Sequence, residues 1–353
     1  MENVKRIGIL TSGGDAPGMN AAVRAVVRQS IGSGLEVVAI YEGFKGLLEK
    51  NAREFKMRDV SNIINTGGTI LYSARCDYFR TPEGVAEGYK CARELELDAI
   101  IGIGGDGTLR GLHDLAQHGL AVVGIPGTID NDMTATEYTI GYDTAMNTAV
   151  DMVDRLRDTC ESHFRCNVVE VMGRRAGYIA LHVGLATGAA QIVTNEVVFD
   201  EEWMFSEIIR GKENKKRHYI IMVAEGVEGY SEGIVQKIQE RTGIETRLTR
   251  LGHVVRGGSP TLRDRVVASR MGIEAVDLLL RGEEGRLMCK KGMDITSVDI
   301  DYALTLDRMY KGSLTDKDHS RFTREQIVKM RQVCETKRAK FSALYRQTLD
   351  ISQ

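Results

Sequence analysis

Residues 99–132 read AIIGIGGDGTLRGLHDLAQHGLAVVGIPGTIDND, and this stretch decides the fold class. Two apolar runs, Ala99–Gly104 and Leu120–Ile125, flank a segment with helical spacing at Leu109–Gln117. Short and almost continuously apolar runs are typical of parallel strands that are buried on both faces. A strand, a helix and a second strand in this order predict a βαβ unit whose helix covers the sheet.

The same alternation recurs along most of the chain. It predicts an α/β protein with two Rossmann-like domains, whose mainly parallel sheets are covered by helices. Six further strands are expected at Arg6–Thr11, Glu36–Tyr41, Asn167–Met172, Gln191–Val198, Tyr219–Ala224 and Thr246–Leu251. Three further helices are expected at Ala21–Ser33, Thr144–Arg157 and Ser231–Thr242. Glycine-rich segments follow several strands, and open parallel sheets bind ligands at such strand ends. We therefore expect the active site in a cleft between two domains.

The chain is 353 residues long, which suits two domains better than one hydrophobic core. The larger domain is expected to comprise residues 1–142 and 255–306. The smaller domain is expected to comprise residues 143–254 and 307–353, and to end in a charged helical tail.

Charge, hydropathy and cysteine usage exclude several classes of protein. A net charge of -2 provides no long-range field for binding nucleic acid or anionic lipid. No apolar run approaches the length needed to span a bilayer, and the chain starts without an apolar signal region. The cysteines are scattered without paired or metal-binding spacing, as is typical of free thiols in a reducing compartment. We therefore expect a cytoplasmic protein with no nucleic-acid or membrane partner.

Two glycine-rich segments follow expected strands and suit phosphate binding. The first, Thr11–Asn20, reads TSGGDAPGMN and precedes a helix whose N-terminal N–H groups are available to a phosphate. The second, residues 102–111, reads GIGGDGTLRG and formally matches GxGxxG, but the next strand ends in PGT instead of a ribose-binding acid. No Gly-Lys-Ser/Thr follows, which excludes a Walker loop. A glycine loop with Asp106 at its centre instead suits Mg²⁺ that bridges phosphate oxygens, and it indicates phosphoryl transfer without identifying the substrate.

Residues 126–132 read PGTIDND and place two carboxylates, Asp130 and Asp132, after another expected strand. Such a pair could merely cap a helix. Because the strand is expected beside the phosphate loop, we favour a base that takes a proton from an acceptor hydroxyl as the O–P bond forms. Arginine forks near other strand ends would hold an anion bidentately. The basic candidates are Arg165, Arg174, Arg247, His253 and Arg256, with Arg75 as a further one.

Taken together, these segments resemble the bacterial 6-phosphofructokinases. The motifs TSGGDAPGMN, GGTILYSAR, IGGDGT, PGTIDND, TIGYDTA, EVMGRRAG, VAEG and LGHVVRGGSPT occur in that family's order between Arg6 and Leu280. Several long motifs in one order are more specific than any single glycine loop. The resemblance implies an ATP- and Mg²⁺-dependent enzyme of glycolysis. It would transfer the γ-phosphoryl group of MgATP to the 1-hydroxyl group of fructose 6-phosphate, giving fructose 1,6-bisphosphate and ADP.

The resemblance also implies roles for individual residues. In the larger domain, ATP would contact Gly14, Arg75, Cys76, Gly105, Asp106, Gly107, Thr108 and Gly111, with Mg²⁺ at Asp106. The catalytic residues would be Asp130 as the base, Arg174 as the stabiliser of transferred charge, Thr128 and Arg75. Fructose 6-phosphate, bound mainly by the smaller domain, would contact Thr128, Asp130, Asp132, Arg165, Met172, Gly173, Arg174, Glu225, Arg247, His253 and Arg256. The family takes Arg165 and Arg247 from a neighbouring subunit, so a homotetramer with shared active sites is implied.

The family divides by phosphoryl donor, and its pyrophosphate-dependent members typically carry GGDD and PKTID in these motifs. This chain has Gly107 and Gly127 at the two positions, which leaves space for a nucleotide and favours ATP. A pyrophosphate-dependent enzyme is the first alternative. A kinase that acts on NAD or a lipid would need no 6-phosphate site. A non-catalytic homologue would be expected to have lost one of Asp106, Asp130 and Arg174.

The family's allosteric site, which binds a nucleoside diphosphate or phosphoenolpyruvate between subunits, is only partly matched. Its basic positions correspond to Arg24, Arg28, Arg157 and Lys216. Ala190, Asn214 and Asn62 replace a glutamate, an arginine and an aspartate of the family. A solvated turn explains the basic residues 215–217 equally well. Our hypothesis is that ADP activation is weak or altered in sign. Saturation curves for fructose 6-phosphate with and without MgADP test it, and a large leftward shift would refute it.

Overall fold

The computed structural model describes residues 4–351, with all side chains in that range except those at positions 317 and 319. The chain divides into two compact units. The first unit contains the residues up to Ile129, Met133–Thr144 and Arg256–Arg331. The second unit contains Asp130–Asp132, Ala145–Val255 and the residues from Gln332 onward.

The first unit is built on a seven-stranded sheet with the order β11-β10-β5-β4-β1-β2-β3. The five central strands are parallel, whereas β3 and β11 pair antiparallel at the two edges. The strands are β1 (Arg6–Ser12), β2 (Glu36–Ile40), β3 (Ala52–Phe55), β4 (Ala99–Gly104), β5 (Ala121–Pro126), β10 (Arg286–Lys291) and β11 (Asp294–Asp299). All six residues of β4 are buried, as expected for a central strand covered on both faces.

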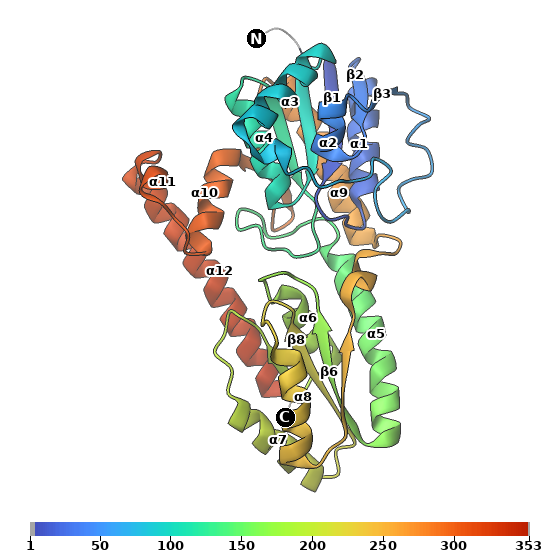
Figure 1. Cartoon of the computed structure of the whole chain (residues 1–353), viewed down its shortest axis with the longest axis vertical. Helices are drawn as coiled ribbons and strands as arrows, with labels where there is room; N and C mark the ends of the chain where they lie inside the picture. Colours follow the sequence, from blue (N-terminus) through green and yellow to red (C-terminus); the bar gives the residue numbers. More distant parts are fainter. Residues whose placement is uncertain (1–3, 352–353) are drawn as a thin grey trace. The chain divides into compact units, whose positions relative to one another are not determined.

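Helices cover both faces of this sheet (Figure 1). The pair α1 and α9 packs together on one face, while α2, α3, α4 and α10 contact one another in sequence on the other. The helices are α1 (Met19–Gly32), α2 (Gly43–Glu49), α3 (Pro82–Glu94), α4 (Asp106–Gln117), α9 (Leu262–Leu280), α10 (Ile300–Tyr310) and α11 (Asp316–Ser320), with the 3-10 turn η1 (Tyr78–Arg80). A second 3-10 turn, η2 (Gly252–Arg256), belongs to the second unit except for its last residue, Arg256. The first unit is therefore a three-layer sandwich with its parallel strand ends on one edge.

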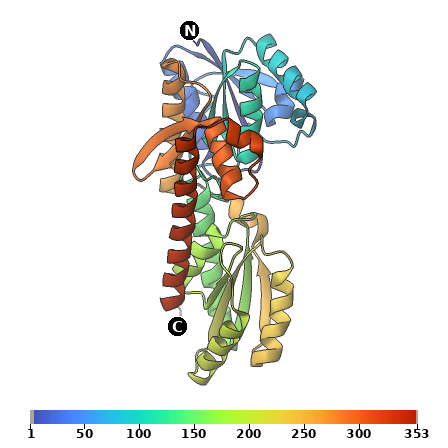
Figure 2. The same ribbon diagram turned by 90° about the vertical axis from the view of Figure 1, so that its left-hand side faces the viewer.

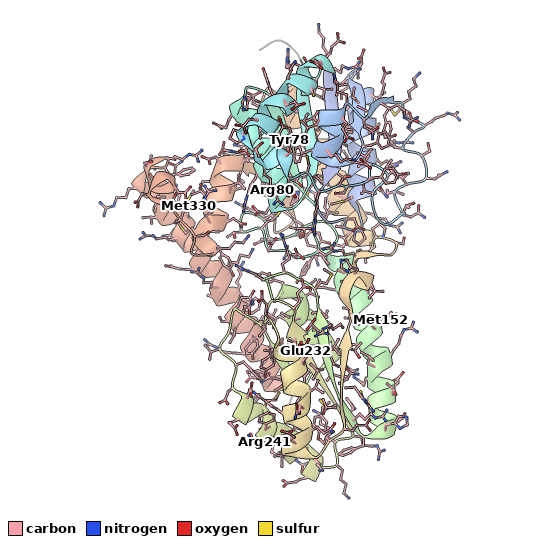
Figure 3. The ribbon with its side chains drawn as sticks, in the orientation of Figure 1. Tyr78, Arg80, Met152, Glu232, Arg241 and Met330 are labelled. Atoms are coloured by element: carbon pink, nitrogen blue, oxygen red, sulfur yellow. The ribbon has the colours of Figure 1, made fainter. Side chains whose placement is uncertain are left out.

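The second unit is built on a smaller sheet of four parallel strands in the order β7-β8-β6-β9. The strands are β6 (Arg165–Val171), β7 (Gln191–Val193), β8 (His218–Ala224) and β9 (Thr246–Arg250). The helices that contribute to this unit are α5 (Tyr142–His163), α6 (Tyr178–Thr187), α7 (Glu201–Glu213), α8 (Tyr230–Thr242) and the long α12 (Arg324–Ile351), which Figure 2 shows in dark red. One hydrophobic cluster joins α7 and α8 to the sheet through Phe205, Ile208, Tyr219 and Ile238. On the surface, Arg241 of α8, which is labelled in Figure 3, pairs with Glu202 of α7 at 2.6 Å.

The predicted α/β fold class with mainly parallel sheets is confirmed. Three strands, β3, β10 and β11, were missing from the prediction. One expected strand is shorter than predicted, because β7 ends at Val193 and not at Val198. The chain turns away at this point, and Val198 is 98% exposed. An alternating apolar pattern alone does not distinguish a strand from such an exposed connection.

The C-terminal segment departs from the predicted domain division. Residues 307–331 group with the first unit, whereas the sequence placed them with the smaller domain. The helix α10 packs on α4, β10 and β11, which accounts for this grouping. Between residues 4 and 351, none of the helices combines the length and the apolar character that crossing a bilayer requires.

Candidate active site

The turn between β4 and α4 is tightly packed. A β-carbon at Gly104 would overlap the Thr108 Oγ1 atom and the carbonyl oxygen of Ser12, so only glycine fits there. Thr108 Oγ1 donates a hydrogen bond of 3.0 Å to that same carbonyl oxygen. Gly105 caps α4 in an extended conformation. The two glycine-rich loops predicted from the sequence are therefore in direct contact.

Asp106 occupies the first position of α4, where the helix N-terminus favours a negative charge. Its carboxylate pairs with Arg110 at 2.5 Å, and its side chain is only 16% exposed. Gly107 follows on the exposed side, and a β-carbon there would meet no atom within 4 Å. Gly111 differs from these residues, because it is buried and a β-carbon there would meet the Phe44 ring at 2.5 Å. The start of α4 thus offers open space beside a carboxylate, while Gly111 serves helix packing.

The loop between β1 and α1 lies against Arg256. Gly13 and Gly18 adopt positive φ angles of 86° and 109°, which favour glycine. A β-carbon at Gly14 would lie 3.2 Å from the guanidinium carbon of Arg256. The sequence assigned Gly14 to the nucleotide and Arg256 to the sugar phosphate. The structure brings the two residues together within the first unit.

The segment that contains Arg75 and Cys76 is tied to the same loop by side chains that the sequence analysis did not single out. The fully buried Asn20 accepts a hydrogen bond from the backbone of Ile70 at 2.8 Å. Ser73 Oγ donates a hydrogen bond of 2.6 Å to the carbonyl oxygen of Gly13. Arg75 is exposed and Cys76 is partly exposed. In the sequence, the only signal for these contacts is that Asn20 lies in the first turn of a helix.

The residues that flank Asp130 lie close to the start of α4. Thr128 lies beside Gly105, where a β-carbon would be 3.7 Å from the Thr128 Cβ atom. On the other side of Asp130, Thr134 donates two hydrogen bonds to Asp307 Oδ1, from its backbone at 2.7 Å and from its hydroxyl at 2.6 Å. Asp106, Thr134 and Asp307 line one small cavity. Asp130 itself is 5% exposed, and Asp132 is partly buried.

A buried carboxylate, Asp264 at the start of α9, holds the TIGYDTA segment in place. Its Oδ1 atom accepts hydrogen bonds from the Tyr138 hydroxyl at 2.5 Å and from the Gly141 backbone at 2.7 Å. Its Oδ2 atom accepts two from Thr144, at 2.9 Å from the backbone and 2.5 Å from the hydroxyl. Burial raises the pKa of Asp264, although these four donors oppose that shift. No sequence signal distinguishes this residue, because a lone aspartate after RGGSPT looks the same as one that only caps a helix.

In the second unit, the turn after β6 carries Arg174. Glu225 Oε1 accepts hydrogen bonds from the backbone of Gly173 at 3.2 Å and of Arg174 at 2.7 Å. Arg174 adopts a left-handed φ of 53° and is exposed, whereas Met172 beside it is buried. A non-glycine residue in this conformation costs free energy, and such strain concentrates at functional sites. Glu225 therefore orients the turn that carries Arg174.

The remaining basic candidates of the second unit divide into a cluster and an isolated residue. Arg165 and Arg247 both pair with Glu245, at 2.8 Å and 2.5 Å. These two ion pairs lower the pKa of Glu245. His253 lies in η2 and is exposed. Arg165 and Arg247 thus form one basic cluster on neighbouring strands, β6 and β9.

The four predicted effector residues are divided between the two units. Arg24 and Arg28 lie on α1 of the first unit. In the second unit, Arg157 of α5 donates to the carbonyl oxygen of Thr187. Lys216 lines a cavity of about 560 Å³ beside α7, together with Ala190 and Asn214. Burial lowers the pKa of Lys216.

The geometry of the first unit defines a class of protein. Glycine-rich backbone, a helix N-terminus and one carboxylate converge at the ends of adjacent parallel strands. This arrangement binds metal-complexed phosphates and is typical of phosphoryl-transfer enzymes.

Comparisons with known proteins identify the family. The phosphofructokinase family model matches residues 6–279. An ATP-dependent 6-phosphofructokinase of Halalkalibacterium halodurans is 53% identical over 282 residues, covering 80% of this chain and 88% of the relative. One of Clostridium botulinum (strain Loch Maree / Type A3) is 47% identical over 313 residues, covering 89% of this chain and 98% of the relative. The solved phosphofructokinase of Saccharomyces cerevisiae superposes with a TM-score of 0.85 at 33% identity, and the match covers 98% of this chain and 50% of the yeast chain. The chain belongs to the phosphofructokinase family.

Proposed function

We propose that this protein is an ATP-dependent 6-phosphofructokinase, acting in glycolysis. It transfers the γ-phosphoryl group of MgATP to the 1-hydroxyl group of fructose 6-phosphate, and the products are fructose 1,6-bisphosphate and ADP. The relatives that are 47% and 53% identical both bear that name. The observation that carries the proposal is the position of Thr128 and Thr134, on either side of Asp130, beside Gly105 and the cavity of Asp106.

The donor is ATP and not pyrophosphate. A β-carbon at Gly107 would extend into open space, so a side chain there would occupy volume that a nucleotide needs. A β-carbon at Gly127 would lie 3.0 Å from Ile103 and 3.1 Å from Met19, which leaves little room for the lysine of pyrophosphate-dependent enzymes. The nucleotide contacts Gly14, Arg75, Cys76, Gly105, Asp106, Gly107 and Thr108. Gly111 supports this site indirectly, because it lets α4 pack closely against the Phe44 ring.

Asp106 fits a Mg²⁺ ion that is bound mostly through phosphate oxygens. Mg²⁺ prefers oxygen ligands and commonly uses one or two carboxylates beside substrate phosphates. The Asp106 carboxylate is largely shielded and adjoins the open space at Gly107. When bound, Mg²⁺ would neutralise charge on the β- and γ-phosphates.

Asp130 is the general base, and Arg174 neutralises charge on the transferred phosphoryl group. A carboxylate that accepts the proton of the 1-hydroxyl group makes its oxygen a better nucleophile. Thr128 and Arg75 assist at the transferred group. The left-handed φ of 53° at Arg174, stabilised by Glu225, supports a dedicated role for this arginine.

Fructose 6-phosphate contacts Asp132, Met172, Gly173 and Glu225 through its sugar. Its 6-phosphate is held by Arg165, Arg247, His253 and Arg256, because guanidinium groups match phosphate oxygens bidentately. Arg165 and Arg247 lie close together because both guanidinium groups pair with Glu245, and this proximity supports their joint role. We further propose a homotetramer in which this cluster serves the active site of a neighbouring subunit. A cytoplasmic location stays a prediction from the sequence.

A coupled assay with fructose 6-phosphate, run with MgATP and then with pyrophosphate, tests the function. We expect turnover with MgATP alone. Turnover with pyrophosphate alone would reverse the donor assignment. No turnover with either donor, from folded protein, would contradict the proposed reaction and favour a non-catalytic homologue.

A further inference from the structure

Glu196 holds the far end of the turn that carries Arg174. Its Oε1 atom accepts a hydrogen bond of 2.8 Å from the Gly177 backbone. Its Oε2 atom is buried, and a β-carbon at Gly177 would lie 2.7 Å from it. Thr194 lies even closer, because its Cβ and Cγ2 atoms would be 2.5 Å from that β-carbon, so Thr194 and the Glu196 carboxylate together require a glycine at position 177. Glu225 fixes Gly173 and Arg174 at the near end, so two glutamates hold the turn at both ends.

The C-terminal helix α12 brings a positive charge, Lys337, to the far end of the same turn. Burial raises the pKa of the Glu196 carboxyl group, hydrogen bonds from the Gly177 and Glu196 backbones and from Thr194 oppose that shift, and the Lys337 ammonium adds a smaller effect in the same direction as these hydrogen bonds. The same ammonium lies 5.2 Å from the centre of the Tyr178 ring, and Tyr178 begins α6 directly after the turn. A buried carboxylate needs such compensation to remain charged.

Packing fixes this part of α12 in the second unit. The Phe341 ring meets Tyr178 edge to face, with ring centres 5.2 Å apart. The Tyr345 hydroxyl donates a hydrogen bond of 3.0 Å to the carbonyl oxygen of Ile192 in β7. Both aromatic side chains are buried. The phosphofructokinase match ends at residue 279, so α12 lies outside the matched region.

We propose that Glu196, through Gly177, and Lys337, through Tyr178, are a pair of positioning residues that hold the Gly173–Gly177 turn, and with it Arg174, in the geometry that phosphoryl transfer requires. The inference rests on the role proposed above for Arg174. The pair touches neither substrate nor the reacting atoms. It acts by fixing the backbone on which the arginine is presented, because a small displacement of a charge-stabilising group costs a large part of its effect.

Kinetics of four variants test the proposal. Lys337→Met removes the charge and keeps the apolar stem, Lys337→Arg keeps the charge, and Glu196→Gln keeps the acceptor for Gly177. The control is Lys340→Met, an exposed position on the same helix. We expect Lys337→Met and Glu196→Gln to lower kcat by about tenfold with an unchanged KM for ATP. Lys337→Arg should restore most of the turnover, and Lys340→Met should match the wild type.

Limited trypsin digestion provides a readout that does not depend on activity. Arg174 and Arg175 are exposed in the turn, so trypsin can cleave after them. The cleavage rate, followed by mass spectrometry, measures how well ordered the turn is. We expect Lys337→Met and Glu196→Gln to raise that rate about tenfold at an unchanged melting temperature. Wild-type kcat and cleavage rates in both variants would overturn the positioning pair. Equal changes in Lys337→Met and Lys340→Met would also overturn it. An inactive wild type whose cleavage rates still respond would instead contradict the proposed reaction alone.

Discussion

Asp130 follows a buried strand and is itself 5% exposed, so its carboxylate is held in one place. If it takes the proton of the acceptor hydroxyl, Asp130→Ala should lower kcat by roughly 10²–10⁴-fold, the usual contribution of a general base. Binding of MgATP, measured by calorimetry, should survive. Glu137→Ala, at an exposed position of the same connection, is the control and should retain activity. A loss below about tenfold would remove Asp130 from this role.

Cys76 is the only one of the six cysteines, all within the described residues, that is not buried. Burial raises the pKa of the thiols of Cys91, Cys160, Cys166 and Cys289, which reduces the thiolate fraction at neutral pH. Iodoacetamide should therefore alkylate Cys76 first, and Cys76→Ser should remove this rapid reaction.

If Cys76 borders the nucleotide, MgATP should slow its alkylation, while MgCl₂ alone should not. Peptide mass spectrometry of the labelled protein measures both rates. Equal alkylation rates with and without MgATP would place Cys76 away from the nucleotide. That result would not bear on the nucleotide contacts proposed for Asp106 and its loop.

At the scale of elements, α9 is joined to the TIGYDTA segment through the four hydrogen bonds that Asp264 accepts. Asp264→Asn replaces one acceptor oxygen with an amide donor, which would face existing donors in a buried site. We expect a loss of about 1–3 kcal/mol in the free energy of unfolding. Urea unfolding followed by circular dichroism measures it.

The matched control for Asp264→Asn is Glu274→Gln on the same helix. Glu274 forms an exposed ion pair with Arg281 at 2.8 Å, and such pairs contribute about 0–1 kcal/mol. If the two variants lost the same stability, the Asp264 hydrogen bonds would not hold α9 in place.

At the scale of the whole molecule, the proposed tetramer can be tested by mixing two inactive variants. Asp130→Ala lacks the base, and Arg247→Ala lacks part of the cluster that a neighbouring subunit would supply. In a closed oligomer, each site would take Asp130 from one subunit and Arg247 from its neighbour. Random mixing of equal amounts of the two variants should then leave both groups intact in about a quarter of the sites. We expect activity to recover after co-refolding and to be absent in the separate variants. A monomer by light scattering, or no recovery in mixed tetramers, would contradict shared sites.

The local parts of the site could be predicted from the sequence, because each depends on neighbouring residues. The glycine turn at Gly104, the carboxylate at the start of α4 and the carboxylates after β5 follow from strand, loop and helix signals that lie side by side in the chain. The strand β10 and the edge strand β11 form a hairpin around Gly292. Only three consecutive residues of β10 are buried, and no residue of β11 is. Their weak apolar alternation explains why they were missed.

The sequence by itself determined the alternating α/β order, the phosphate-binding turns and the family, since these depend on short-range patterns and on motif order. The tertiary structure alone decided which distant side chains meet. Asp264 and Tyr138 are 126 positions apart, and Tyr345 and Ile192 are 153 apart. The turn of Arg174 is likewise held by glutamates that follow two other strands. Contacts over such separations arise only when the sheets are assembled and the helices pack on them, so no local pattern encodes them.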